Sequence, residues 1–118
     1  VTKCYLDRLP KDMIPYWDFD DPMIPNALRD ASAAAIVSSA LLQLSKLEDN
    51  ESLSRRYYCA AVKMIKELSS CRYQSREKNS AILLHSVGNM PAGYEVDASI
   101  NYADYYYMQA LIWCKNNM

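Results

Sequence analysis

The stretch "RDASAAAIVSSALLQL", residues 29–44, decides the fold class because its apolar positions repeat with the period of an α-helix. Asp30 precedes the run and is suited to cap a helix, since its side chain accepts hydrogen bonds from free backbone N–H groups. The small residues of "ASAAA", 31–35, leave room for a neighbouring helix or for a bound group. We predict a helix that starts directly after Asp30. Its expected buried face consists of Ala33, Ile36, Val37, Ala40, Leu41 and Leu44.

Two further segments have helical character after this helix. A polar turn, 47–52, leads to a segment whose apolar residues share one face and predict a helical hairpin: Leu53, Tyr57, Ala60, Ala61, Met64 and Leu68. The last segment begins with Asn101 as a predicted cap and with Asp104 as its reciprocal capping partner. This segment is apolar nearly all round, so we expect protein on every side of it.

The remaining segments are predicted to be loops and helix ends. Residues 1–9 read as the last turns of a helix that Pro10 stops. Residues 11–28 contain three prolines and no helical period, which predicts an extended loop that aromatic residues keep ordered. Residues 81–84 are either a strand or the buried base of a loop.

The composition is that of one soluble globular domain, because 51% of the 118 residues are hydrophobic and 23% are charged. A net charge of -1 without a basic run argues against nucleic acid and an anionic membrane surface as partners. No apolar run reaches the roughly 20 residues that span a bilayer. Because the chain begins at Val1 without a signal segment, we expect a piece of a longer protein and leave its compartment open.

Metal binding is not expected. The four cysteines are widely spaced and accompany a single histidine, which argues against zinc and favours free, buried thiols. Asp18, Asp20 and Asp21 invite a calcium hypothesis. However, a calcium loop that starts at Asp18 would lack its glycine and would have Arg29 in place of the bidentate glutamate.

Several side chains are candidates for ligand contact, and each has a structural alternative. Trp17 is either a platform for a sugar ring or an anchor for its loop. Arg29 and Asp30 stand where a helix N-terminus favours an anion, although Asp30 also suits a simple cap. His85 has no partner for a hydrolase triad, so it is a ligand contact or a structural residue. Gly88 and Gly93 suit bends with positive φ.

Four blocks of sequence together resemble one family. The blocks are "PYWDFDDP" at 15–22, "RDASAAAIVSSALLQL" at 29–44, "AILLHSVGN" at 81–89 and "GYEVDASINYADYYYMQAL" at 93–111. In this order and at similar separations they are similar to the unsaturated glucuronyl hydrolases, glycoside hydrolase family 88, and less closely to the unsaturated rhamnogalacturonyl hydrolases. The resemblance implies an all-α fold, in which residues 1–118 form the C-terminal part of a single (α/α)6-barrel domain with long loops and a short pair of strands.

The resemblance also implies a reaction. Enzymes of this family remove a 4,5-unsaturated uronic acid from the non-reducing end of oligosaccharides that lyases release. An aspartate protonates the C4=C5 vinyl ether, water adds at C5, and the resulting hemiketal rearranges and expels the next sugar. No metal and no organic cofactor are implied. The family's catalytic aspartates match no position here, so we assign no catalytic residue and expect the isolated chain to be inactive.

The resemblance implies that this chain supplies residues of the barrel wall and of loops that face the substrate. The candidate substrate-binding residues are Trp17, Asp18, Arg29, Asp30, Ser32, His85, Ser86, Gly88 and Asn89. In the family, the loop that matches the last four residues lies near the subsites beyond the cleaved bond. Met90 stands where relatives often have a basic residue that favours sulfate. The expected partners are an unsaturated oligosaccharide and the remaining barrel helices. The alternative is a non-catalytic helical module whose aromatic face binds another protein chain.

Overall fold

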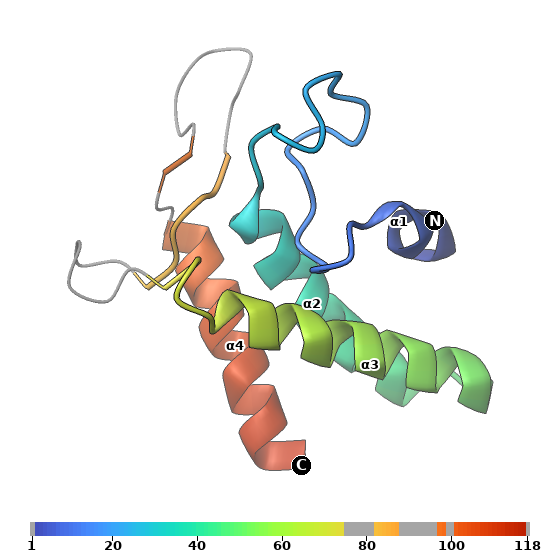
Figure 1. The fold of residues 1–118 in the computed structure, drawn as a ribbon. Helices are drawn as coiled ribbons and strands as arrows, with labels where there is room; N and C mark the ends of the chain where they lie inside the picture. Colours follow the sequence, from blue (N-terminus) through green and yellow to red (C-terminus); the bar gives the residue numbers. More distant parts are fainter. Residues whose placement is uncertain (1, 75–81, 88–96, 99–100, 118) are drawn as a thin grey trace.

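The chain is helical, as the sequence predicts. A computed structural model describes residues 2–74, 82–87, 97–98 and 101–117. Four helices follow one another, α1 (Thr2–Arg8), α2 (Ala31–Leu47), α3 (Glu51–Leu68) and α4 (Asn101–Asn117) (Figure 1). Within these ranges the extended pairing is limited to isolated bridges between residues 16 and 29, 74 and 83, and 86 and 98. Residues 82–84 are therefore the base of a loop, and the expected strand pair is absent from the described residues.

The helices α2 and α3 form the predicted hairpin and begin at side-chain caps. Asp30 Oδ1 accepts a hydrogen bond from the Ser32 N–H at 3.1 Å, and Asn50 Oδ1 accepts one from the Leu53 N–H at 3.1 Å. Each cap satisfies a backbone donor that the helix itself leaves free. None of the helices in the described part is long and apolar enough to span a membrane.

The predicted buried face of α2 is wrong in detail. Ile36 is 37% exposed and Ala40 is exposed, whereas Ser38 is fully buried. The buried side is made of small residues and leucines: Ala31, Ala34, Ala35, Ser38, Leu41, Leu42 and Ser45. Because the Ser38 and Ser45 hydroxyls donate to carbonyls one turn earlier, at 2.9 and 2.7 Å, these serines are buried without an unmet polar group. A pattern that counts apolar residues alone therefore missed this face.

The helix α3 buries the predicted side, and α4 is covered on one side only. Tyr57, Ala60, Ala61, Met64 and Leu68 of α3 are buried, while Leu53 is only partly so. On α4 the buried residues are Ala103, Tyr107 and Ala110. Its other faces carry Tyr102, Tyr105, Met108 and Ile112 at 39, 56, 42 and 54% exposure. The described residues thus cover one side of α4 and leave its other apolar faces exposed.

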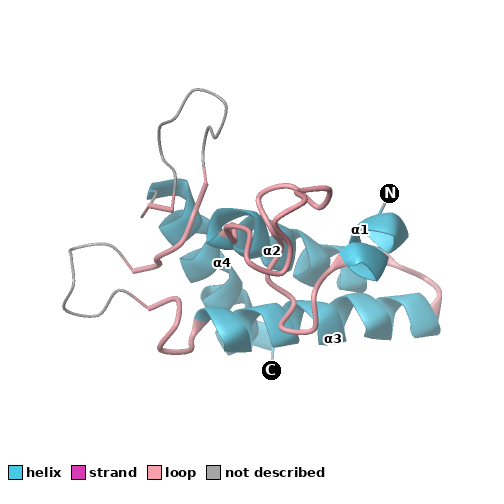
Figure 2. Cartoon of the chain, turned by 45° about the horizontal axis from the view of Figure 1, so that its top comes forward, coloured by secondary structure: helices cyan, strands magenta, loops and turns pink. Residues whose placement is uncertain are grey.

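The N-terminal third consists of α1 and a long loop that packs near the start of α2. The helix α1 ends at Arg8, before Pro10, as predicted. The following loop is ordered and lies against the helices (Figure 2), where Ile14 is fully buried. Hydrogen bonds of 2.9 Å from the Trp17 N–H to the Leu28 carbonyl and from the Asp30 N–H to the Pro15 carbonyl close the loop at its base. Its two ends therefore meet at the start of α2.

The four cysteines are free thiols, but the expectation that they are buried is wrong for three of them. Cys4, Cys59 and Cys71 are exposed, and Cys114 is half-buried. Each of the three exposed residues lies on the outer side of a helix or in a turn, where the residue type alone gave no orientation. Burial raises the pKa of the Cys114 thiol, so this residue stays protonated at neutral pH.

Candidate functional site

The candidate site lies where the first turns of α2 and α4 meet the turn that follows α3 (Figure 1). The short segment of residues 82–87, which we call the crossing segment, joins these three parts. The Leu84 N–H donates to the Tyr73 carbonyl at 2.7 Å, and the His85 carbonyl accepts from the Ala31 N–H at 2.9 Å. Ser86 and Ala98 exchange two backbone hydrogen bonds of 2.8 and 2.9 Å. The backbone of the crossing segment is therefore held from several directions.

His85 presents its ring from the middle of this segment. Its φ of 63° lies in the left-handed region, which costs a residue with a Cβ of the order of 1 kcal/mol. Its Nδ1 is 2.7 Å from Asp97 Oδ1, and the ring meets Tyr73 edge to face at 5.8 Å between centroids. Both His85 and Asp97 keep more than 40% of their side chains exposed, at 45 and 43%. The imidazole is thus oriented by two neighbours and still reaches solvent.

A pocket of about 300 Å³ opens beside this histidine. It is lined by Ala27, Leu28, Arg29, Arg72, Tyr73, His85 and Asp97. Two of the residues predicted from sequence, Arg29 and His85, come together here. Sequence reasoning missed Arg72, Tyr73 and Asp97 as members of this site.

Arg29 is fixed by protein groups. Its Nη1 donates to both carboxylate oxygens of Asp12, at 2.7 and 2.8 Å, and to the Ile14 carbonyl at 3.0 Å. Its Nη2 donates to the Tyr16 hydroxyl at 3.2 Å, and its guanidinium carbon lies 4.1 Å from the centroid of the same ring. Burial alone would lower the pKa of Arg29, but the hydrogen bond and charge of Asp12 outweigh it and raise the pKa. Arg29 therefore anchors its loop with a permanent charge.

Trp17 and Asp18 lie outside this pocket, and their side chains form hydrogen bonds within their own loop. The Trp17 indole N–H donates to Asp21 Oδ2 at 2.6 Å. Asp18 is exposed, and its Oδ1 accepts from the Asp20 N–H at 2.9 Å. The ring of Trp17 remains partly accessible, so its expected role as a platform stays a prediction.

Asp30 holds backbone N–H groups in this structure, and Ser32 and Ser86 are buried beside it. Asp30 Oδ1 accepts from the Ser32 N–H, from the Ser32 hydroxyl at 2.5 Å and from the Val87 N–H at 3.1 Å. Ser32 is 2% exposed, and Ser86 is fully buried, its hydroxyl without a partner among the described residues. Their substrate-binding role remains a prediction. The predicted contacts Gly88 and Asn89, like Met90 and Gly93, lie outside the residues that the structure describes.

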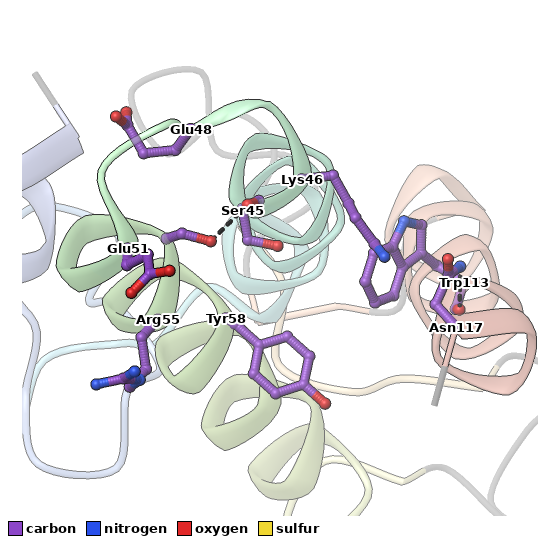
Figure 3. A pocket seen from close by; sticks show the side chains of 9 residues that line it. Ser45, Lys46, Glu48, Glu51, Arg55, Tyr58, Trp113 and Asn117 are labelled. Carbon is purple, nitrogen blue, oxygen red and sulfur yellow. Dashed lines mark hydrogen bonds between the residues drawn. The ribbon is translucent and has the colours of Figure 1, made fainter.

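A larger cavity of about 470 Å³ lies at the other end of α2 (Figure 3). Its floor is the last turn of α2, and its walls come from α3 and α4. The Lys46 ammonium lies 5.7 Å from the Trp113 ring centroid, and the Ser54 hydroxyl donates to the Ser45 carbonyl at 2.6 Å. None of the residues predicted from sequence lines this cavity. In the described ranges there is also no group of three or more His, Cys, Asp or Glu side chains placed to hold a metal.

Comparison with known proteins finds relatives for nearly the whole chain. No family model matches the chain. The unsaturated glucuronyl hydrolase of Formosa agariphila is 44% identical over 115 residues, which cover 94% of this chain and 28% of that protein. A crystal structure of an unsaturated glucuronyl hydrolase specific for heparin superposes with a TM-score of 0.88 at 38% identity, over 97% of this chain and 31% of the other. Over nearly its whole length the chain is similar to unsaturated glucuronyl hydrolases, and its fold matches theirs.

The unsaturated chondroitin disaccharide hydrolase of Streptococcus pyogenes serotype M1 is also similar, at 32% identity over 114 residues, or 95% of this chain and 29% of that protein. The chain thus spans less than a third of the length of these relatives. The resemblance to unsaturated glucuronyl hydrolases is confirmed over nearly the whole chain, and so is the helical fold that it implied. Because the likeness to unsaturated glucuronyl hydrolases covers nearly all of this chain, the crossing segment and its pocket lie within the shared fold.

Proposed function

We propose that the protein to which this chain belongs is a glycoside hydrolase that removes a 4,5-unsaturated uronic acid from the non-reducing end of glycosaminoglycan-type oligosaccharides. The observation that carries the proposal is the 44% identity over 94% of the chain to an unsaturated glucuronyl hydrolase. Two relatives support the substrate class, since one is named for chondroitin disaccharides and another is described as specific for heparin.

The reaction proposed for the whole protein hydrates a vinyl ether. An acid protonates C4 of the unsaturated sugar, and water adds at C5 to give a hemiketal that opens and releases the next sugar. The three aspartates that contact the crossing segment or its histidine do not have the environment of such an acid. Asp30 and Asp104 have their carboxylates occupied by backbone N–H groups, and Asp97 is paired with His85. This chain accordingly contributes binding surface to the reaction.

The pocket beside His85 is the part of this chain that we assign to substrate contact. Its arginines already have carboxylate partners, because Arg29 contacts Asp12 at 2.7 Å and Arg72 contacts Asp12 at 3.3 Å and Glu67 at 3.5 Å. Asp97 likewise pairs with His85 at 2.7 Å. A sulfate would have to compete with these carboxylates for the same donors. The pocket therefore suits the hydroxyl groups of an unsulfated sugar ring, with Tyr73 at its wall.

The exposed apolar side chains support the view that this chain packs against further helices of one barrel. Tyr105 and Ile112 on α4 are more than half exposed, and Leu47 at the end of α2 is 78% exposed. An exposed apolar face such as that of Tyr105, Met108 and Ile112 on α4 marks a surface that other protein covers. We infer that further helices of the parent protein pack there and supply the catalytic carboxylates, so the 118-residue chain alone is inactive.

The test is an assay of the full-length protein on unsaturated disaccharides released by lyases from chondroitin and from heparin, each with and without sulfate. The expected result is loss of the ultraviolet absorbance of the C4=C5 bond, with the unsulfated disaccharide preferred. A folded full-length protein that consumes none of these substrates would refute the proposal and would favour the non-catalytic interaction module. Preference for a sulfated disaccharide would refute the proposal that the pocket beside His85 binds an unsulfated sugar ring.

A further inference from the structure

The carboxylate of Asp104 holds one end of the crossing segment. Asp104 lies in the first turn of α4, and its predicted role as the reciprocal partner of the Asn101 cap stays a prediction. Its Oδ2 accepts from the Ile82 N–H and its Oδ1 from the Leu83 N–H, both at 3.0 Å. Hydrogen bonds from N–H groups to a charged carboxylate are stronger than those between neutral groups. Both oxygens are thus used to bind the backbone of another segment.

The carboxylate of Asp30 holds the other end in the same way. Its Oδ1 accepts from the Val87 N–H at 3.1 Å, and the next residue along α2, Ala31, donates its N–H to the His85 carbonyl at 2.9 Å. Two acidic side chains, each at the start of a different helix, therefore bind the two ends of one segment of six residues. The sequence shows these aspartates in separate blocks and gives no sign that they share a target.

His85 lies between the two carboxylates in a strained conformation. A left-handed φ of 63° persists in a residue other than glycine when surrounding contacts determine it. The contacts of Ile82, Leu83 and Val87 to the aspartates supply that constraint. The direction of the His85 ring into the pocket follows from the backbone that they hold.

We propose that Asp104 is a positioning residue that sets the place of the His85 imidazole through the backbone of the crossing segment. Both oxygens of Asp104 bind Ile82 and Leu83, and none of these three residues lines the pocket. Its effect on a substrate rests on the proposed function, whereas its effect on the backbone does not.

The first experiment measures amide hydrogen exchange in the full-length protein by mass spectrometry with residue-level fragmentation. Asp104→Ala removes both acceptors, and Asp104→Asn keeps the shape and one acceptor. We expect exchange at Ile82 and Leu83 to rise about tenfold in the alanine variant and less in the asparagine variant, with α3 unchanged. Asp7→Asn, on an exposed ion pair, is the control. Unchanged exchange at both amides in the two variants would overturn the proposal.

The second experiment places the effect at His85. Asp104→Asn should raise KM for the unsulfated unsaturated disaccharide about threefold to tenfold and change kcat by less than about twofold, because it moves a binding group only. In a His85→Gly background the same substitution should leave KM unchanged, since its target is gone. An equal rise in both backgrounds would overturn the role of His85. If the wild-type protein is inactive, the proposed function fails and the exchange result still decides whether Asp104 holds the segment.

Discussion

The stability of the Arg29→Met variant tests whether Arg29 anchors its loop or is free to bind a ligand. Arg29 and Asp12 are only 19 and 18% exposed, and the guanidinium also binds the Ile14 carbonyl and stacks on Tyr16. Removing one partner of a mostly buried pair costs about 3–5 kcal/mol. Because Arg72 remains 3.3 Å from Asp12 and retains part of the compensation, we expect a loss of about 3 kcal/mol, at the lower end of that range.

The assay is thermal and urea unfolding followed by circular dichroism. In the full-length protein, whose relatives are more than three times as long as this chain, 1 kcal/mol corresponds to roughly 2 °C, so Arg29→Met should lower Tm by about 6 °C. Arg56→Met is the matched control, since its bond to Asp7 joins side chains that are 40 and 54% exposed and is worth at most about 1 kcal/mol. A double-mutant cycle with Asp12→Asn should give a coupling of about 2 kcal/mol. If Arg29→Met costs no more than Arg56→Met, the anchoring role is refuted.

Three further predictions concern stability. Burial and the charge of Asp30 raise the pKa of Tyr5 to about 12, so the folded state favours the neutral phenol. The free energy of unfolding should therefore fall between about pH 10 and 12. Tyr5→Phe should lessen that fall, as measured by urea titrations at each pH. Since His85 has a positive φ, His85→Gly should be more stable than His85→Ala by about 1 kcal/mol, and the reverse order would contradict the conformation. Ser38→Leu should cost about 1–3 kcal/mol by overpacking, whereas Ile36→Leu should stay within about 0.5 kcal/mol; equal costs would contradict the observed burial of α2.

The helices could be predicted from the sequence because their signals are local. Asp30 caps α2 as expected, and the apolar period of α3 identifies its buried side. The buried side of α2 could not be predicted in the same way. Its serines satisfy their own hydroxyls within the helix, and two neighbouring helices rather than one determine which side is covered. Apolar periodicity measures neither effect.

The site could be predicted only in part. His85 and Arg29 were visible as candidates, but the pocket depends on contacts between residues far apart in the chain, such as the pairing of His85 with Asp97 and of Arg29 with Asp12. The role of Asp104 shows the same limit. An acidic residue in the first turn of a helix has a local explanation, and only the fold reveals that its oxygens bind Ile82 and Leu83.

The central claim is that this chain forms a working part of an unsaturated glucuronyl hydrolase, and a chimera tests it most directly. In the Formosa agariphila relative, the residues that align with this chain would be replaced by the chain itself. We predict that the chimera consumes the C4=C5 absorbance of an unsulfated unsaturated disaccharide, while the isolated chain does not. A chimera that folds and leaves that absorbance unchanged would contradict the claim.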